Sequence, residues 1–297
     1  EFPSNLYPRM NLASRGVEAR RVAVQHGRVD AEQVFDACDS KTRLIAISWV
    51  GYASGWRIPV SEFVDRAHAR GILVFLDAIL GLGVFPLDVR QCGVDFLAAD
   101  GHKWLLGPDG AGFCYVKREH LNLLRPLYLG WNSVVHAFDF GKSELNLRPE
   151  AARYEGGSQN MAGFLGLRAS LELLQSFGLR PSQSPLAERI VGLTDYAAER
   201  LESCGAHMLH RPPSEHRSGI LIFEMPGNDP AAVRKRCLDA GIVLSVRGGG
   251  LRISPHAYND EADVDRLHVP ADDIDDVSHR GVLRQDVVDA VVEQVLV

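Results

Sequence analysis

LVFLDAILGLGVFPLDVRQCGVDFLAADGHKWLLGPDGAGFCYV, residues 73–116, is the stretch that decides the fold. An acid, Asp77, ends its first apolar run, and the pair His102-Lys103 follows a second one. A Gly-Pro-x-Gly turn at residues 107–110 then leads into a third run. In an open α/β sheet, the carboxyl ends of the strands line the ligand crevice. We therefore expect Asp77 and Lys103 to point into one cleft from neighbouring loops.

Strand and helix patterns alternate on both sides of this stretch. Apolar runs predict strands at residues 44–50, 72–76, 94–98 and 112–116, with a helix that opens at Pro59 and stops at Gly71. Strands interleaved with helices in this way are typical of a βαβ-type, largely parallel sheet. The predicted fold class is therefore α/β.

The second half of the chain has a different pattern. It predicts helices at residues 161–177, 186–204 and 230–240 and strands at 219–224, 242–246 and 251–254. We interpret this half as a smaller α+β domain and place the boundary at residues 179–185. The expected organisation is a large domain at residues 1–180, the small domain at 181–267, and an acidic linker with a terminal helix at 268–297.

The composition excludes several classes of function. The chain has 297 residues, 46% of them hydrophobic, and a net charge of −6. It is long enough for a large core but offers no basic face to nucleic acid or to an anionic membrane, and no apolar run reaches the length of a membrane span. Five cysteines without a CxxC spacing predict a reducing, cytoplasmic setting and no metal site. No GxGxxG motif opens a helix after the first strand, which argues against a dinucleotide.

Lys103 and Asp77 have side chains that suit covalent cofactor chemistry. A lysine between bulky apolar neighbours can lose its proton and attack a carbonyl group. A carboxylate that faces a pyridine nitrogen keeps that ring protonated, so that the ring accepts electrons. Each residue also has an ordinary interpretation, because a lysine often ends a strand and an aspartate often caps a turn. Their occurrence one βα unit apart favours the chemical interpretation.

Four motifs carry a resemblance to a known family. They are the strand end at residues 77–83, GHKWLLGP at 101–108, ARYEGGSQN at 152–160 and LRISPHAYN at 251–259. Over residues 1–267 the chain resembles the class V aminotransferases, which are pyridoxal-phosphate enzymes of fold type I. It looks closest to the isopenicillin N epimerase-like and cysteine desulfurase-like branch. The resemblance implies pyridoxal 5'-phosphate as the cofactor and a PLP-dependent transferase-like large domain with a mostly parallel sheet.

The resemblance implies roles for the residues that match the family's motifs. Lys103 resembles the Schiff-base lysine, and Asp77 resembles the partner of the pyridinium nitrogen. His102 looks like the residue that contacts the cofactor phosphate. Gly157 and Ser158 resemble a pair that reaches the phosphate in the neighbouring subunit's site, which implies a homodimer with shared active sites. On spacing alone, Ser158 is equally well explained as a helix N-cap.

Arg252 resembles the arginine that binds the α-carboxylate of the substrate. A planar guanidinium matches a carboxylate with a pair of hydrogen bonds, and the glycines at residues 248–250 would allow a ligand to approach closely. An arginine at the start of a strand is, however, more often a surface residue. Arg247 carries little weight and is interpreted as a gating or surface residue.

The chain departs from the family's pattern in three places. Leu80 stands where the family has a glutamine that holds the cofactor's phenolic oxygen, although the hydroxyl of Tyr52 could supply part of that contact. The chain begins at Glu1 and lacks the family's preceding phosphate turn. We therefore expect a fragment that binds the cofactor poorly unless the missing segment is restored. Phe2 aligns with an aromatic residue that stacks on the cofactor ring.

The resemblance implies a small amino-acid substrate that reacts at its α-carbon by transamination, epimerisation or C–S lysis. A persulfide-forming desulfurase needs a reactive thiol shortly before the substrate arginine, but residues 244–251 contain no cysteine. Cys237 falls in a helical pattern and is expected in the core. Persulfide formation is therefore disfavoured. The alternative is a non-catalytic or truncated homologue that acts as a dimeric scaffold, which Leu80 and the missing segment favour.

Overall fold

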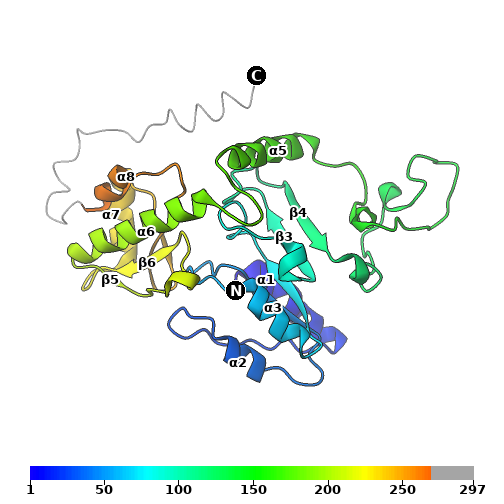
Figure 1. The fold of residues 1–297 in the computed structure, drawn as a ribbon, viewed down its shortest axis with the longest axis horizontal. Helices are drawn as coiled ribbons and strands as arrows, with labels where there is room; N and C mark the ends of the chain where they lie inside the picture. The colour runs from blue at the N-terminus through cyan, green and yellow to red at the C-terminus, as the bar shows by residue number, and fades with distance from the viewer. Residues whose placement is uncertain (269–297) are drawn as a thin grey trace. The chain divides into compact units, whose positions relative to one another are not determined.

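The structure is a computed structural model that describes residues 1–268. The chain folds into two compact units, each with its own sheet (Figure 1). The parallel-sheet unit comprises Cys38–Trp49 and Val60–Ser176. The antiparallel-sheet unit comprises Glu1–Ala37, Val50–Pro59 and the described residues from Phe177 onward.

The parallel-sheet unit contains a four-stranded sheet in the order β1-β2-β3-β4. Its strands are β1 (Leu44–Ser48), β2 (Leu73–Asp77), β3 (Phe96–Asp100) and β4 (Gly112–Val116). The first three strands are parallel, and β4 runs antiparallel to β3. The sheet is therefore mostly parallel, as the sequence predicts. β2 and β3 are neighbours, so their carboxyl ends meet at one edge.

Helices pack on this sheet through apolar residues that repeat on one helix face. The helices of the unit are α3 (Val60–His68), α4 (Val89–Cys92) and α5 (Met161–Ser176), with short 3₁₀ helices at Arg118–His120, Trp131–Ser133 and Ala151–Tyr154. In α3, Phe63, Val64 and Ala67 are buried, as their spacing predicts. Val74 and Leu76 of β2 are fully buried as well. This core holds the end of β2 in place.

The antiparallel-sheet unit contains a second sheet, in the order β5-β6-β8-β7. Its strands are β5 (His207–Met208), β6 (Leu221–Glu224), β7 (Ser245–Arg247) and β8 (Gly250–Ile253). Its helices are α1 (Pro3–Met10), α2 (Ala31–Asp36), α6 (Pro185–Ser203), α7 (Pro230–Asp239) and α8 (Glu261–Asp265), with 3₁₀ helices at Asn11–Arg15, Ser214–His216 and Arg266–His268. Leu193 and Leu201 of α6 share a core with Phe223 and Leu251 of the sheet, so α6 packs directly on this sheet.

The predicted elements agree with the structure except where a segment buries little. The strand predicted at residues 112–116 coincides with β4, and the helix predicted at 161–177 ends one residue earlier, at Ser176. The sequence pattern does not predict α1 or α2. α1 buries no residue and α2 buries only Phe35, so neither short helix has the buried apolar face on which the prediction of a helix rests.

The predicted domain boundary at residues 179–185 stays a prediction. The compact units divide the chain at Phe177 and place residues 1–37 and 50–59 with the C-terminal sheet. The predicted terminal helix falls outside the described residues, within 269–297. None of the helices in residues 1–268 combines the length and hydrophobicity needed to cross a membrane.

Candidate active site

Asp77 is the last residue of β2 and stands at the carboxyl edge of the parallel sheet. It pairs with Ser48 of β1 on one side and with Ala98 of β3 on the other, and it is half-buried. Its Oδ1 accepts a hydrogen bond from the backbone N–H of Ile79 at 3.0 Å. A turn that follows directly from β2 thus orients the carboxylate at the edge where open α/β sheets bind ligands.

Lys103 lies in a closed loop between β3 and β4. The N–H of Gly101 donates to the carbonyl of Ala111 at 2.9 Å, and the N–H of Gly107 donates to the carbonyl of Gly101 at 2.8 Å. The N–H of Leu106 donates to the carbonyl of Lys103 at 3.0 Å, and Leu106 has a φ of 57°. This left-handed conformation is unfavourable for a leucine. The surrounding hydrogen bonds therefore hold the loop, and the half-buried Lys103 within it, in one shape.

The loops that follow β2 and β3 touch each other backbone to backbone. Gly83 has a φ of 92°, and a Cβ at this position would overlap the carbonyl oxygen of Trp104. Only glycine allows so close an approach. Asp77 begins the first of these loops and Lys103 lies in the second. The structure thus places the two residues on neighbouring loops, as the sequence predicts, while their chemical roles stay predictions.

His102 faces two carboxylates. Its Nδ1 lies 3.2 Å from Oδ2 of Asp100 and 3.3 Å from Oδ1 of Asp109. Asp100 also accepts the N–H of Gly101 at 2.7 Å. The sequence pattern does not reveal this setting, because the loop must close before Asp109 comes near the imidazole. The two acids thus lie beside Nδ1 of the ring, and the phosphate contact of His102 stays a prediction.

A buried carboxylate, Asp95, joins several elements of the same unit. Its side chain is 1% exposed and lies 2.8 Å from Nε2 of His68 and 2.8 Å from Nε2 of His120. It also accepts the N–H of Val74 at 2.7 Å. Burial by itself would raise the pKa of Asp95, but the hydrogen bonds from His68, Val74 and His120 outweigh it, and the pKa is lowered. No local sequence pattern marks this cluster, because His120 and His68 lie 25 and 27 residues from Asp95 in the chain.

Gly157 and Ser158 lie in the loop that leads into α5. Ser158 is exposed, and a Cβ on Gly157 would stand 3.3 Å from Nε1 of Trp131. The residue that caps α5 is Asn160, whose Oδ1 accepts the N–H of Gly163 at 3.0 Å. The interpretation of Ser158 as the helix N-cap is therefore wrong, and its hydroxyl stands at the surface of the unit.

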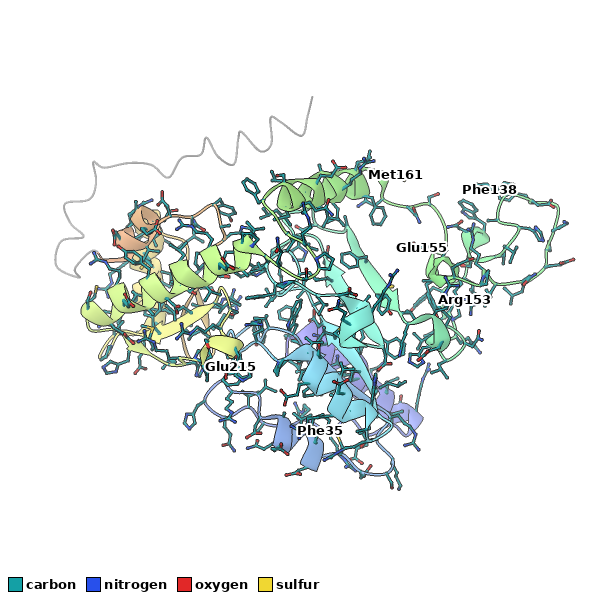
Figure 2. All side chains as sticks on the ribbon, in the orientation of Figure 1. Phe35, Phe138, Arg153, Glu155, Met161 and Glu215 are labelled. Atoms are coloured by element: carbon teal, nitrogen blue, oxygen red, sulfur yellow. The ribbon has the colours of Figure 1, made fainter. Side chains whose placement is uncertain are left out.

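Residues 121–148, here called the apolar segment, lie between β4 and α5 in the chain and expose large apolar side chains. Figure 1 shows this segment reaching away from the sheet of its unit, and Figure 2 labels Phe138 on it. Its exposed side chains include Leu127, Tyr128, Phe138, Phe140 and Leu145. The rings of Phe138 and Phe140 lie 5.4 Å and 6.2 Å from that of Trp131. Gly157 adjoins Trp131, so the Gly157-Ser158 pair lies next to the apolar segment.

In the antiparallel-sheet unit, Arg252 lies in the middle of β8 and is half-buried. Its Nη1 donates to the backbone carbonyl of Tyr52 at 2.5 Å, and its Nε is buried without a hydrogen-bond partner among the described residues. Burial lowers the pKa of Arg252, and the nearby charge of Arg247 lowers it further. A desolvated arginine with a spare donor is suited to receive an anion. The interpretation of Arg252 as a surface residue is wrong.

Tyr52 and Phe2 belong to the same unit as Arg252. The backbone carbonyl of Tyr52 accepts a hydrogen bond from Arg252. The side-chain type of Tyr52 does not predict this contact. The ring of Phe2 meets that of Tyr52 edge-on, with centroids 5.4 Å apart. Phe2 is the N-cap residue of α1 and is 42% exposed. Their predicted contacts with a cofactor stay predictions.

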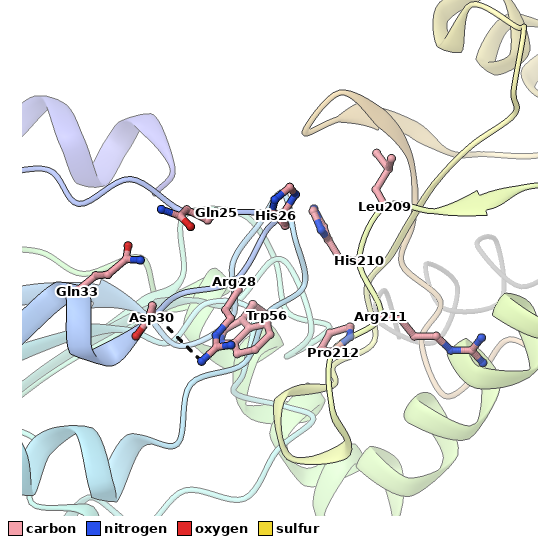
Figure 3. A pocket seen from close by; sticks show the side chains of 10 residues that line it. All are labelled: Gln25, His26, Arg28, Asp30, Gln33, Trp56, Leu209, His210, Arg211 and Pro212. Carbon is pink, nitrogen blue, oxygen red and sulfur yellow. Dashed lines mark ion pairs between the residues drawn. The ribbon is translucent and has the colours of Figure 1, made fainter.

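A separate pocket in the antiparallel-sheet unit contains none of the residues that the sequence singles out (Figure 3). Its volume is about 400 Å³, and it is lined by Gln25, His26, Arg28, Asp30, Gln33, Trp56, Leu209, His210, Arg211 and Pro212. The guanidinium of Arg28 lies 5.9 Å from the Trp56 ring and 4.0 Å from Asp30. Nε1 of Trp56 and Nδ1 of His210 are buried without partners in the described residues. No sequence motif marks this pocket, because folding alone brings its three segments together.

The side chains at the edge of the parallel sheet fit a pyridine ring that carries an aldehyde and a phosphate. Lys103 supplies an amine and Asp77 a carboxylate, which are the two groups that such a cofactor requires. The close approach of Gly83 to Trp104 keeps the two loops together without a side chain between them. Leu80 is 9% exposed and offers no polar atom. The residues present therefore fit pyridoxal phosphate, apart from the contact that Leu80 lacks.

Comparisons with known proteins give matches that span most of the chain. The profile of the aminotransferase class-V family matches residues 1–267. A probable cysteine desulfurase of Methanothermobacter thermautotrophicus is 32% identical over 285 residues, which cover 90% of this chain and 69% of the relative. A cysteine desulfurase of Escherichia coli is 30% identical over 258 residues, which cover 86% of this chain and 60% of the relative.

The solved structures agree in fold. The apo structure of a cysteine desulfurase from Thermococcus onnurineus matches with a TM-score of 0.80 at 24% identity, over 90% of this chain and 69% of that one. This match confirms the predicted fold class. The chain spans 69% and 60% of the lengths of the two curated relatives.

Proposed function

The chain belongs to the class V aminotransferase family of pyridoxal phosphate-dependent enzymes, and from this premise we propose that it cleaves the C–S bond of a small sulfur-containing amino acid, with Lys103 as the amine that binds the cofactor. The predicted family, enzyme class and cofactor are confirmed. The substrate, the reaction and the site residues are our proposal.

The contact between the loops of Asp77 and Lys103 is the observation that carries this proposal. Pyridoxal phosphate, when bound, supplies an electron sink that stabilises negative charge at the α-carbon of an amino acid. The Nζ of Lys103 would hold the cofactor at its aldehyde carbon and would serve as the base for the α-proton of the substrate. The carboxylate of Asp77, oriented by the N–H of Ile79, would keep the ring nitrogen protonated.

Arg252 would bind the α-carboxylate of the substrate. Its Nη1 is engaged with the carbonyl of Tyr52, so Nε and Nη2 form the remaining side of the guanidinium. Nε lacks a partner in the described chain, and a carboxylate accepts two parallel N–H bonds from such a fork. Binding of the carboxylate would therefore satisfy a donor that the protein itself leaves unpaired.

C–S lysis is favoured over the other reactions of the family because the relatives that match this chain are named cysteine desulfurases. In this reaction the α-proton is removed and the sulfur leaves with the electron pair of the C–S bond. The pairing of β7 with β8 ends at Arg247 and Gly250. The turn between these two residues is too short to form a loop that carries a reactive thiol. Burial raises the pKa of Cys237 on α7, which disfavours the thiolate. We therefore expect the sulfur to be released rather than stored on a hairpin cysteine.

A homodimer is part of the proposal, and the apolar segment supports it. Tyr128 is 90% exposed and Phe138 is 77% exposed, whereas isolated soluble proteins rarely expose large contiguous apolar patches. The exposed Ser158 adjoins this surface through Gly157 and Trp131. A second copy that covers the apolar segment would receive the Ser158 hydroxyl at its own cofactor phosphate.

Cofactor attachment is tested by mass mapping. The purified chain is incubated with pyridoxal phosphate, reduced with borohydride and digested, and the peptides are weighed. With the cofactor in excess, to offset the weak binding expected of this chain, we expect the pyridoxyl group on Lys103 and its absence in Lys103→Ala. Lys235→Ala, which removes an exposed lysine paired with Asp239 on α7, should keep the adduct. An adduct spread over surface lysines would favour the non-catalytic scaffold.

The reaction type is tested on the same preparation with cysteine and cystine. C–S lysis releases sulfide or persulfide together with a keto acid and ammonia. Transamination forms a keto acid without releasing sulfur, and epimerisation changes only the optical rotation of the amino acid. Sulfur release that depends on Lys103 is the expected result. Keto acid without sulfur release would reject C–S lysis in favour of transamination.

A further inference from the structure

The pocket of the antiparallel-sheet unit, here called the Trp56 pocket, is built from three separate stretches of chain (Figure 3). Its lining residues come from the stretch 25–33, from Trp56 and from residues 209–212. In the first stretch, the N–H of Arg28 donates to the carbonyl of Gln25 at 2.9 Å and closes a tight turn. Gly27 in that turn has a φ of 74°, and a Cβ at this position would overlap the ring of His210. Only glycine allows so close an approach, so the packing of the chain itself holds the pocket open.

Two buried nitrogen atoms of the lining have no partner. Trp56 is 8% exposed, and its ring stacks on that of His216 with centroids 4.1 Å apart, which fixes the indole. Neither Nε1 of Trp56 nor Nδ1 of His210 has a hydrogen-bond partner among the described residues. Buried polar groups are nearly always paired in folded proteins, and an indole N–H can only donate. A ligand that satisfies Trp56 must therefore bring an acceptor atom.

The pocket also contains one cation and one anion that are only loosely paired. Nη2 of Arg28 lies 4.0 Å from Oδ2 of Asp30, too far for a hydrogen bond, and the guanidinium lies 5.9 Å from the centre of the Trp56 ring. The second lining cation, Arg211, is already neutralised, because it donates to both carboxylate oxygens of Glu202 at 2.8 Å and 2.7 Å. Arg28 and Asp30 are thus the charges that a ligand would meet.

His210 adds no charge to this pair at neutral pH. Burial lowers the pKa of its imidazole, and the nearby charge of His26 lowers it further. The remaining wall is apolar, because Leu209 and Pro212 line the same pocket. Its volume of about 400 Å³ falls within the range of roughly 300–1,000 Å³ that is typical of small-molecule sites.

We propose that the Trp56 pocket binds an apolar α-amino acid as a zwitterion, with the carboxylate on Arg28 and Trp56 Nε1, the ammonium on Asp30, and the side chain along Leu209 and Pro212. A guanidinium matches a carboxylate with two N–H bonds. A ligand with a carboxylate alone would meet the negative charge of Asp30, and a ligand with an amine alone would meet the positive charge of Arg28. A zwitterion pairs with both. None of the residues assigned to the proposed reaction lines this pocket.

The indole N–H of Trp56 reports binding directly. The chain has four tryptophans, and the signal that Trp56→Phe removes from the ¹⁵N NMR spectrum belongs to Trp56. The probes are L-leucine, 4-methylpentanoate, which lacks the ammonium, and 3-methylbutylamine, which lacks the carboxylate. We expect leucine to shift the Trp56 signal saturably, because Nε1 gains an acceptor. Each of the other probes should need an about tenfold higher concentration, the loss of one charge-assisted interaction.

Variants show which residue meets which end of the ligand. In Arg28→Gln, leucine should bind no better than 3-methylbutylamine does to the wild type. In Asp30→Asn, it should bind no better than 4-methylpentanoate does. The side chain of Asp30 caps α2 through the N–H of Glu32, and asparagine is an equally good N-cap, so this variant keeps the helix.

Matched controls change the same residue types elsewhere in the unit. Arg200→Gln breaks an exposed pair with Asp265, and Asp229→Asn alters the residue that caps α7. Both should bind leucine as the wild type does. Circular dichroism of each variant verifies the fold.

Three results would overturn the proposal. One is a Trp56 signal that leucine does not shift, and another is equal binding of leucine and 4-methylpentanoate, which would indicate a simple anion site. The third is a shift that is lost in Arg252→Met, which would place the ligand at Arg252 instead. The reduced adduct on Lys103 is measured separately, so failure of this inference leaves the proposed function standing, and the reverse also holds.

Discussion

The candidate site residues lie in two regions. One is the pair of loops that follow β2 and β3, and the other is the β7–β8 hairpin. The charged side chains have partners of opposite kinds in the two regions. In the loops, Asp77 accepts a backbone N–H and His102 meets two carboxylates. In the hairpin, Arg247 and Arg252 donate to backbone carbonyls, and neither forms an ion pair with an acid among the described residues. Partners within the protein fix geometry in advance, while unpaired buried charge costs stability until a ligand arrives. We infer that the loops are preformed and that the hairpin is completed by its ligand.

Lys103→Ala should have the largest effect, which is on cofactor attachment. It also shows whether the loops and the hairpin act separately. We expect complete loss of the reduced cofactor adduct, because no other residue in that loop supplies an amine. Phenylglyoxal modifies accessible arginines, and protection of Arg252 from it by added propionate should be unchanged. Peptide mass mapping measures both in one sample. If Lys103→Ala also abolished protection of Arg252, the two regions would not be independent.

Asp95→Ala should cause the largest loss of stability in the parallel-sheet unit. The carboxylate is buried between His68 and His120, and removal of one partner from a buried charge cluster costs about 3–5 kcal/mol. Urea denaturation followed by circular dichroism measures the free energy of unfolding. The control is Glu172→Ala, which breaks an exposed pair with Arg168 on α5 and should leave stability unchanged. Equal effects of the two substitutions would show that the Asp95 cluster contributes no more than a surface pair.

The Asp95 cluster also predicts a dependence of stability on pH. The pKa of Asp95 is lower in the folded chain than its ordinary value, which is about 3.9 in an unfolded chain. Its stabilisation is therefore fully present above that value and is lost as the pH falls through the folded pKa. Urea denaturation between neutral and acidic pH should show a steeper loss for the wild type than for Asp95→Asn. Parallel curves would contradict the assignment.

Arg252→Met should have the smallest effect on stability and tests the hairpin side of the comparison. The substitution removes a charge whose Nε is buried without a partner in the described residues, and apolar replacement of such groups is often neutral or stabilising. We expect an unchanged or slightly higher free energy of unfolding without ligand. Added propionate should stabilise the wild type but not the variant. A loss as large as that of Asp95→Ala would mean that Arg252 is a structural residue.

The order of the elements was predictable because each has a local signal. β2 alternates between fully buried and half-buried residues, and α3 buries Phe63, Val64 and Ala67 at helical spacing. Such periodicities depend only on which face of an element is buried. α1 lacks that signal because it buries no residue, and it was therefore missed.

Candidate site residues were predictable from the sequence where they follow a strand. They were not predictable where their setting depends on a partner far away in the chain. Asp77 and Lys103 follow apolar runs, and the edge of a parallel sheet is where ligands bind. His102 was predicted without its acids, and Asp95 was not singled out at all. The partners of both depend on how loops close and how elements pack, which a local pattern does not encode.

The sequence by itself determined the strands and helices with strong apolar periodicity and the positions of Asp77 and Lys103 at the ends of neighbouring strands. Only the tertiary structure decided that Arg252 donates to the backbone carbonyl of Tyr52, 200 residues earlier in the chain, and that its Nε is buried without a partner among the described residues. The reason is physical. Burial of one face repeats along the chain and can be read locally, whereas the partner of a charged group is set by segments that meet only after folding.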